Sequence, residues 1–490
     1  MKNCIPLDIL GHADSAGAFR RSRGGDPGLA AFGTLVDQIR EKNQGGVLLL
    51  DCGDEIDCRY WPGKPVLDGL HLIGTDCFTL GNHEFDRGKE GLDRWISQAQ
   101  FPMVCANVIE LATGERPAGM VPYCIFERHG VKIGVLGLTT EYTPKMVTAS
   151  AFEGYQMTSA VEACHKYLPQ MQAEGAQVLV VVAHMPFYIN DDQSVWGELL
   201  DLMHDIPKID VLVGGHIPGE YCAEVEGTAV CKGGFSFTSL PQVRLWFDPE
   251  QGKVVKKECF LLHPDPDAPA NPEYKAFADS VCAPFEPYLA QKVAHTDREW
   301  VIHLSSENPL GNYLADCMRR AADTEICYMN ATSAGSFIKP GDILMEDILR
   351  ITGFNDPIQR AEITGKQLYE LFELVHVPER YGNNAGLFFS GIHVYMDHTK
   401  PAWQKVLKIT LPDGTPVELD RKYSVASSEY MASGGNDTSA VANQLHWTPL
   451  DICAQDNLRN CLMNDGEIKL LSEDQRMYEI GRPENDNSPF

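Results

Sequence analysis

Five side chains of the metal-ligand type follow short apolar runs in the first half of the chain. They stand in or after the segments ILGHAD, LLLDCGDEID, FTLGNHEFD, VVVAHMPF and VLVGGHIPG, and they are Asp14, Asp54, Asn82, His184 and His216. Carboxylate, amide and imidazole donors together suit Mn, Fe, Zn or Mg rather than a soft thiolate site. Functional side chains of α/β folds stand where strands pass into loops. The pattern therefore predicts one shared divalent metal site.

The segment GNHEFD carries the most specific part of this pattern. Gly81 lets backbone approach a bound ion, Asn82 offers a neutral oxygen ligand, and His83 points at the same space. Asp86 is close enough in sequence to orient His83. A single His after a strand is more often structural than ligating. The joint occurrence of these segments, in this order, predicts a phosphoesterase metal site.

Alternating strands and helices must position these side chains. The runs 47–50, 178–182 and 211–213 are continuous apolar stretches, typical of strands buried on both faces. Between them, 29–40 and 160–173 carry helical apolar spacing. Strands alternating with helices predict an α/β core.

Composition changes divide the chain into four parts. Residues 1–262 form the α/β domain, and 263–304 form a linker that has four prolines in its first ten residues and then a pair of helices over 275–294. Residues 305–450 form a second domain that opens with a helix over 310–322. Residues 451–490 are polar, so we expect a surface extension with a frayed end.

Length and charge limit the class of protein. A chain of 490 residues predicts two or three domains. The formal net charge of −27 argues against nucleic-acid polymers and membrane surfaces as partners, but it allows a small phosphorylated substrate held through a cation. The chain starts without an apolar leader and lacks an apolar run long enough to span a bilayer, and its 15 cysteines are scattered, so we expect a cytoplasmic protein with reduced thiols.

The motifs above resemble the calcineurin-like metallophosphoesterase domain of the 5′-nucleotidase family. In the second half, ENPLGNYLADCMR, GDILMEDILRITGFNDPIQRAEITGKQL and SVASSEYMASGGND resemble the C-terminal domain of the same family. The similarity covers residues 4–247 and 305–437. The resemblance implies an α/β fold with a four-layer β-sandwich flanked by helices, plus a second α/β (α+β) domain.

The resemblance also implies a two-ion centre, of which one ligand set is complete here. Asp54, Asn82, His184 and His216 match one ion's ligands, and His83 and Asp86 match the catalytic His–Asp pair. The other ion keeps Asp14 and shares Asp54, but its two histidines are replaced by Ala16 and Pro218. His12, two residues before Asp14, either substitutes in part or packs beneath the site; Asp57 is a further candidate ligand.

In the second domain the family grips a nucleoside between aromatic side chains and arginines. The family's arginine-containing segment is NATSAG here, and Thr438 follows the closing Gly-Gly-Asn-Asp where an aromatic is usual. Phe388 or Phe389 is a remaining stacking face, or else an ordinary core residue. Asn330, Asn355 and Asn436 are remaining polar contacts, or else turn residues. We predict substrate binding by Asn330, Phe388 and Asn436.

These observations lead to two hypotheses. The first is a metal-dependent phosphoester hydrolase of 5′-nucleotidase type, acting on a nucleotide or other small phosphorylated metabolite, with an altered centre of one or two divalent ions (Mn, Zn, Fe, Co or Mg) per chain. The second is a weak or inactive pseudoenzyme that binds a ligand in the same cleft; Ala16, Pro218 and the missing arginine favour it. The oligomeric state is not predicted.

Overall fold

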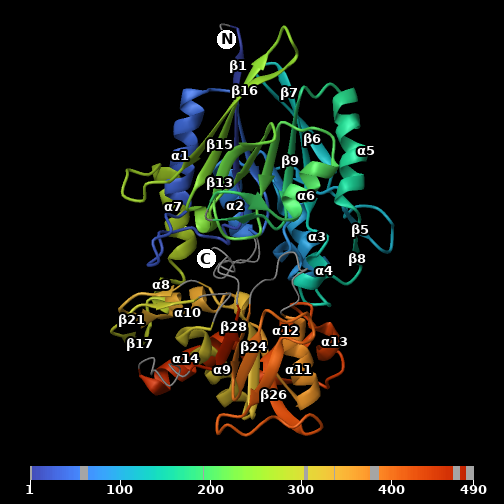
Figure 1. Cartoon of the computed structure of the whole chain (residues 1–490). Helices are drawn as coiled ribbons and strands as arrows, with labels where there is room; N and C mark the ends of the chain where they lie inside the picture. The colour runs from blue at the N-terminus through green and yellow to red at the C-terminus, as the bar shows by residue number, and fades with distance from the viewer. Residues whose placement is uncertain are drawn as a thin grey trace. The chain divides into compact units, whose positions relative to one another are not determined.

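The computed structural model describes residues 3–55, 64–190, 192–302, 307–335, 337–375, 386–466 and 475–481, and every structural statement below concerns these residues. The chain divides into two compact units, one ending at Pro284 and the other starting at Phe285 (Figure 1). The break falls within 263–304, the part for which the sequence predicts a linker. Each unit is described by itself.

The first unit is built on two six-stranded sheets. One sheet has the order β16 (Lys253–Leu262), β15 (Leu240–Asp248), β1 (Ile5–His12), β2 (Val47–Asp51), β3 (Cys77–Thr79), β4 (Met103–Val104). The other has the order β13 (Tyr221–Val225), β14 (Thr228–Lys232), β12 (Val211–Gly214), β9 (Val178–His184), β7 (Val131–Thr139), β6 (Tyr123–Arg128). The neighbours β1, β2, β3 and β4 run parallel, as do β7, β9, β12 and β14. Parallel neighbours bring the carboxyl ends of their strands to one edge of each sheet.

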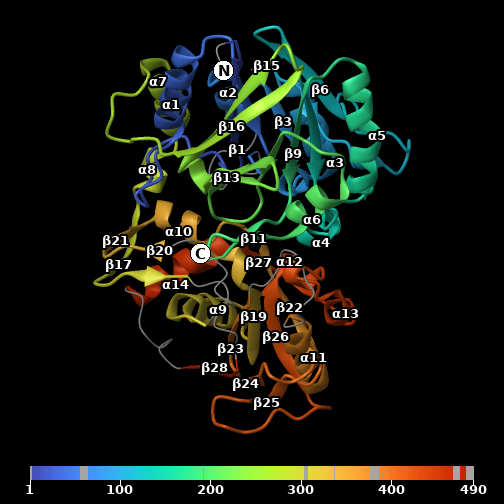
Figure 2. The same cartoon turned by 45° about the horizontal axis from the view of Figure 1, so that its top comes forward.

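Helices cover the outer faces of both sheets. The helices of this unit are α1 (Leu29–Lys42), α2 (Lys64–Leu72), α3 (Gly88–Gln98), α4 (Thr143–Met146), α5 (Ala160–Ala173), α6 (Glu198–Asp205) and α7 (Pro272–Cys282). Two short strand pairs complete the unit: β5 (Val108–Glu110) with β8 (Tyr155–Met157), and β10 (Tyr188–Ile189) with β11 (Val195–Trp196). Valines and leucines of both sheets share one core between them, while α5 and α6 pack on the outer face of the second sheet. Figures 1 and 2 show α1 and α7 together on the opposite side. The expected four-layer α/β arrangement is confirmed.

The predicted elements of this unit form close to where the sequence puts them. The helix expected over 160–173 is α5, and the one over 29–40 is α1, which runs two residues further. β2, β9 and β12 contain the three apolar runs, and each is buried along its whole length. The helix pair expected over 275–294 is only partly right. α7 and the short α8 (Glu286–Leu289) are present, but the strand β17 (Lys292–Thr296) begins before residue 294.

The second unit is a three-layer α/β domain. Its five-stranded sheet has the order β23 (Leu387–Ser390), β19 (Ile326–Asn330), β26 (Lys422–Ser428), β22 (Pro357–Thr364), β27 (Thr448–Cys453). The remaining strands are β25 (Val406–Thr410), β24 (His393–Asp397) and β28 (Met477–Ile480) in one sheet, and the pairs β17 with β21 (Gly341–Leu344) and β18 (Trp300–Val301) with β20 (Phe337–Ile338). The helices are α8, α9 (Pro309–Ala322), α10 (Met345–Ile351), α11 (Gly365–Leu374), α12 (Glu429–Ala432), α13 (Ser439–Ala442) and α14 (Ala454–Asp465). Alternate residues of β19 face two different cores, one beneath α9 and one beneath α11.

The polar C-terminal stretch is not a surface extension along its described length. Leu458 and Leu462, one helical turn apart on α14, are almost fully buried in the core that α9 also lines. β28 pairs in parallel with β24, and the Arg476 guanidinium lies 2.7 Å from the Asp316 carboxylate. The expectation fails because two leucines at helical spacing anchor an otherwise polar helix. The expected frayed end at 482–490 lies outside the described residues.

Two further features of the described residues concern membrane spans and cysteines. Within the ranges given above, no helix combines the length and the apolar character that crossing a bilayer requires. The cysteines of the same residues are free thiols, as the scattered spacing predicts.

Glu198 at the start of α6 provides a test of the fold through pH. Its carboxylate accepts hydrogen bonds from the Thr140 hydroxyl at 2.6 Å and from the Glu141 amide at 3.3 Å, and burial raises its pKa from 4.5 to about 7. A raised pKa means that the folded state favours the protonated form, so stability is fully present below pH 4.5 and is lost as the pH rises through 7. Relative to Glu198→Gln, the wild-type chain should lose roughly 3 kcal/mol of unfolding free energy between pH 4.5 and pH 8. Urea unfolding across this range checks the difference; a constant difference would contradict it.

Candidate metal centre

The predicted ligands stand at the carboxyl ends of parallel strands in both sheets. His184 is the last residue of β9, and His216 follows β12 by two residues. Asp54 follows β2, and Asn82 follows β3. These four side chains therefore come from one edge of each sheet, as the sequence predicts.

The ligand atoms of Asp54, His184 and His216 all lie within 4.8 Å of one another. The Nε2 atom of His184 is 2.9 Å from Oδ2 of Asp54, and the two imidazole rings are 5.1 Å apart. The Nδ1 atom of His216 is 2.9 Å from Oδ1 of Asn82, which adds the amide oxygen to the group. All of these side chains but His216, which is half-buried, are buried.

The hydrogen bonds of His184 fix the ring for metal binding. Its Nδ1 donates to the Cys52 carbonyl at 2.6 Å, so in the neutral ring Nε2 is left as the acceptor. This Nε2 is fully buried, and the atom it faces is Oδ2 of Asp54 at 2.9 Å. An imidazole nitrogen and a carboxylate oxygen that converge in this way can both bind one divalent cation. The residues present therefore fit one ion of the Mn, Fe, Zn or Co class.

The electrostatics of the centre are dominated by the buried Asp54 carboxylate and the imidazoles around it. Burial would lower the pKa of His184, but Asp54 outweighs burial and raises it to about 10. Burial, followed by the charge of His184, lowers the pKa of His216 to about 3. Burial would raise the pKa of Asp54, but His184 and His83 hold it below its ordinary value. The carboxylate field that favours a proton on His184 equally favours a cation.

Several of these residues have an unusual backbone conformation. Asp14, Asp54 and His216 have φ values of 56°, 58° and 82°, in the left-handed region. Asp and His are among the non-glycine residues that tolerate this region best, at a cost of about 1–2 kcal/mol each. Such strain is typical of functional sites, where the surrounding structure holds the residue in place.

His83 and Asp86 form the pair that the sequence predicts. Both belong to the turn around the short 3-10 helix His83–Phe85, and the Nδ1 atom of His83 donates to Oδ2 of Asp86 at 2.7 Å. The backbone amide of His83 donates to Oδ1 of Asp54 at 2.8 Å, which ties the pair to a metal ligand. The His83 side chain is 28% exposed, so a ligand can reach it.

Glu84 and Lys232 contribute to the centre, and the sequence reasoning missed both. The buried Glu84 carboxylate accepts from the backbone amides of Asp54, Glu55 and Gly81, and so joins the loops after β2 and β3. The fully buried Lys232 ammonium donates to the Pro218 carbonyl at 3.2 Å. Burial lowers the pKa of Lys232 to about 7, while the charge of Asp14 opposes this shift. The sequence signal that could have identified Lys232 is a lysine at the end of the apolar run AVCK.

The second predicted ligand set stays incomplete. The buried Asp14 accepts the His216 amide at 3.0 Å through Oδ2, and burial raises its pKa to about 7. Ala16 and Pro218 offer no ligand side chain. His12 does not take their place, because its ring faces Asp51 and Glu55 instead. Asp57 lies outside the described residues.

The residues predicted to bind substrate differ in their surroundings. Asn330 is buried at the end of β19, and its Oδ1 has no hydrogen-bond partner among the described residues. The prediction that Phe388 binds substrate is wrong. Phe388 is 2% exposed and packs on Gly311 of α9, so it is a core residue and offers no stacking face. Phe389 is equally buried, in the other core. Asn436 has a φ of 54°, and its backbone amide donates a hydrogen bond to the Tyr430 hydroxyl at 3.1 Å, so it lies in a turn.

A glycine allows the two loops of the centre to cross. A Cβ atom at Gly81 would lie 2.1 Å from Oδ1 of Asp54. We expect Gly81→Ala to destabilise the chain by about 1–3 kcal/mol and to weaken Mn²⁺ binding at least tenfold, because Asp54 must move. Gly88→Ala serves as a comparison: it adds backbone strain at φ 62° but meets no atom within 4 Å, whereas Gly81 is outside the left-handed region and its variant tests the contact with Asp54. Thermal melts with and without Mn²⁺ check both variants; a Gly81→Ala chain that binds Mn²⁺ normally contradicts the expectation.

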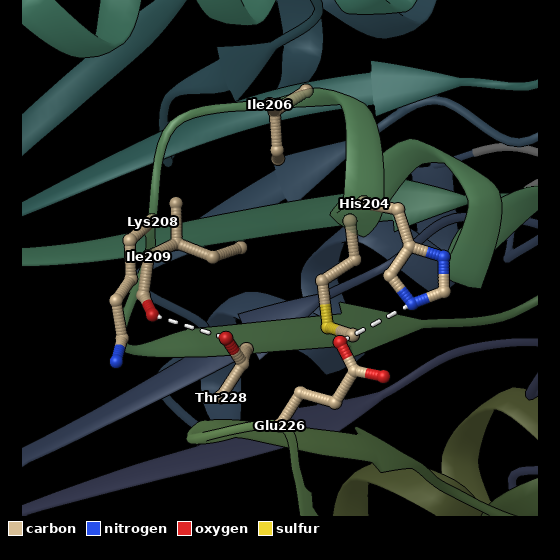
Figure 3. A pocket seen from close by; sticks show the side chains of 7 residues that line it. His204, Ile206, Lys208, Ile209, Glu226 and Thr228 are labelled. Atoms are coloured by element: carbon tan, nitrogen blue, oxygen red, sulfur yellow. Dashed lines mark hydrogen bonds and ion pairs between the residues drawn. The ribbon is translucent and has the colours of Figure 1, made fainter.

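A surface cavity in the same unit is separate from the metal centre. Its lining includes His204, Lys208, Glu226 and Thr228, and Figure 3 shows His204 facing Glu226 across it. These two side chains lie 3.4 Å apart and are at least half exposed. An exposed ion pair is weak, and the described lining adds no third carboxylate, imidazole or thiol to this pair.

Comparisons with known proteins agree with this geometry. Residues 12–220 match the family of calcineurin-like phosphoesterases, and residues 292–443 match the 5′-nucleotidase C-terminal domain. A 5′-nucleotidase of Vibrio cholerae is 28% identical over 88% of this chain and 85% of its own length, and the snake venom 5′-nucleotidase of Naja atra is 25% identical over 84% and 85%. The crystal structure of a 5′-nucleotidase precursor from Thermus thermophilus covers 98% of this chain and 100% of its own, with a TM-score of 0.85 and 21% identity, and it supports the fold. The chain belongs to the 5′-nucleotidase family, with a calcineurin-like phosphoesterase domain followed by a 5′-nucleotidase C-terminal domain.

Proposed function

We propose that this chain is a metal-dependent phosphoester hydrolase of 5′-nucleotidase type, acting on a nucleotide or another small phosphorylated metabolite through an altered metal centre. The observation that carries the proposal is the convergence of Asp54, Asn82, His184 and His216 beside the His83–Asp86 pair. The curated relatives named 5′-nucleotidase support this substrate class.

The four ligand residues would hold one divalent ion. When bound, such an ion polarises a phosphoryl oxygen and lowers the pKa of a water molecule. Asn82 and Asp54 supply oxygen ligands, and His184 is kept in the correct tautomer by the Cys52 carbonyl.

His83 is the proton donor in this proposal. Because Nδ1 of His83 donates to Asp86, its Nε2 faces away from that carboxylate and can carry a proton to the leaving oxygen. The neighbouring Asp86 charge stabilises the protonated ring. Lys232 adds a buried positive charge whose field acts on Asp14.

The experiment is a hydrolysis assay on the purified chain. Nucleoside monophosphates and 4-nitrophenyl phosphate are tested with Mn²⁺, Co²⁺, Zn²⁺ and Mg²⁺ in turn. We expect turnover that requires an ion and that EDTA abolishes. Hydrolysis at the buffer rate with every ion and every ester would contradict the enzyme hypothesis.

Ala16 and Pro218 favour a second candidate, a ligand-binding pseudoenzyme. Loss of a second ion is expected to remove several kcal/mol of transition-state stabilisation. A thermal shift on adding nucleotide, without turnover, supports this alternative. The double variant Ala16→His/Pro218→His distinguishes an impaired enzyme, in which turnover rises, from a pseudoenzyme, in which it stays absent.

A further inference from the structure

A second cluster of ligand-type side chains lies in the first unit, outside the set described above. His12 ends β1 and Asp51 ends β2, and the two residues are direct partners in the parallel pairing of these strands. Glu55 follows four residues after Asp51. One potential ligand atom from each of His12, Asp51 and Glu55 lies within 4.8 Å of the other two.

The cluster is closed to solvent. His12 is 1% exposed, and Asp51 and Glu55 are fully buried. Phe32 and Phe237 pack their rings against the His12 imidazole. Charged groups in such surroundings need a partner of opposite charge or a metal.

Key atoms of the cluster have no partner within the described parts of the chain. Neither ring nitrogen of His12 has a hydrogen bond, and Oδ2 of Asp51 has none. The nearest contacts are His12 Nε2 to Asp51 Oδ2 at 3.7 Å and His12 Nδ1 to Glu55 Oε1 at 3.4 Å. Native structures rarely leave such groups unsatisfied, because each costs about 1–3 kcal/mol.

The remaining oxygens are held in fixed positions. Oδ1 of Asp51 accepts the Gly53 amide at 2.9 Å, and the Glu55 carboxylate accepts both the amide and the hydroxyl of Ser15. The orientation of both carboxylates is therefore set by neighbours, as for ligands supported by a second layer of hydrogen bonds. Two ligands that each stand about 2.1 Å from one ion are separated by about 3.0–3.4 Å, close to the contacts observed here.

Buried acidic groups are concentrated in this region: Asp14, Asp51, Asp54, Glu55 and Glu84. The buried Lys232 ammonium is a neighbouring positive charge of Asp14. Buried charged groups are paired or coordinate a metal, so this concentration of carboxyl groups favours a bound cation.

We propose that His12, Asp51 and Glu55 form a second divalent cation site. One imidazole and two carboxylates suit Zn²⁺, Mn²⁺ or Fe²⁺, with one ring nitrogen bound to the ion. Its role is to hold the segment 51–55, which also carries Asp54 of the first site. The site shares no residue with the Asp54, Asn82, His184 and His216 set.

The test is the metal content of the full chain, measured by elemental analysis after loading with Zn²⁺ or Mn²⁺ and desalting. We expect two ions per wild-type chain and one in each of His12→Gln, Glu55→Gln and His184→Ala. The double variant His12→Gln/His184→Ala should hold none. His129→Gln, in which an exposed histidine at the β6–β7 turn is changed, is the matched control and should hold two.

The two ions should also differ in their rate of release. His216 of the first site is half-buried, whereas the second site is closed, so a chelator should remove the second ion at least tenfold more slowly. The slow phase should be absent from His12→Gln and Glu55→Gln and present in His184→Ala.

Two results would overturn the site: one ion per wild-type chain at saturation, or two ions retained in both His12→Gln and Glu55→Gln. If one variant fails to fold, the other variant and the wild-type content still decide the question. None of these readouts uses hydrolysis, so an inactive chain with two ions refutes the proposed function and upholds this site. An active chain with one ion does the reverse.

Discussion

The His83→Ala variant is expected to hydrolyse a nucleoside monophosphate about a thousandfold more slowly than the wild-type chain, while keeping its bound metal. General acid catalysis by a positioned histidine contributes a factor of about 10²–10⁴. Metal binding should survive, because the amide of residue 83 donates to Asp54 and alanine retains that amide. Turnover rates and metal content measured on the same preparation check both parts.

The choice of substrate makes this prediction more specific. A 4-nitrophenolate leaves without protonation far more readily than a ribose alkoxide, so His83→Ala should slow 4-nitrophenyl phosphate hydrolysis much less. Asp86→Asn should cost less than His83→Ala, since it removes the orientation of the ring and leaves the acid in place. Equal losses on both substrates would show that His83 acts on the phosphoryl group and not on the leaving oxygen. Unchanged turnover would remove His83 from the mechanism.

The second large effect is expected from His184→Ala. The variant removes the buried Nε2 that faces Asp54, so the chain should lose one ion and at least a thousandfold in turnover at micromolar Mn²⁺. Excess Mn²⁺ should restore part of the activity, because Asp54, Asn82 and His216 remain. A Mn²⁺ titration, with binding measured by calorimetry and turnover measured at each Mn²⁺ concentration, checks this result.

Two further variants keep the His184 prediction decisive. His184→Gln retains a polar side chain in the buried position and controls for a folding defect. His204→Ala changes a half-exposed histidine outside the centre and should alter neither metal content nor turnover. If His184→Ala binds Mn²⁺ with wild-type affinity, the ion lies elsewhere.

The sequence predicted the strand ends well because their pattern is strong. Long apolar runs that finish in Asp, Asn or His can be recognised without any tertiary information, and β2, β9 and β12 form where expected. The parallel order of the strands then brings Asp54, Asn82, His184 and His216 together. Which side chains support these ligands could not be foreseen, because Glu84 acts through the backbone amides of two loops that meet only in the folded chain.

The errors have a common physical origin. From the sequence alone, Phe388 can be either an exposed stacking face or a core residue. Only its packing against Gly311 in the folded chain distinguishes the two. The polar α14 has only a narrow apolar stripe, so its burial depends on a core supplied by distant segments. For His12 the sequence allows two interpretations, partial replacement of the missing histidine or packing beneath the site, and the register of β1 with β2 directs its ring toward Asp51.

The left-handed backbone at three ligand positions affects which mutations the chain can absorb. Glycine relieves the conformational cost at residues 14, 54 and 216, and asparagine bears it well, whereas valine, isoleucine and threonine are the least compatible. A saturation library scored for cellular abundance should therefore rank Gly and Asn as the mildest replacements at these positions, although each abolishes or weakens a ligand. At some positions the residue that gives the highest cellular abundance will differ from the residue that catalysis requires. These are the positions where the chain has lost folding stability in favour of catalysis.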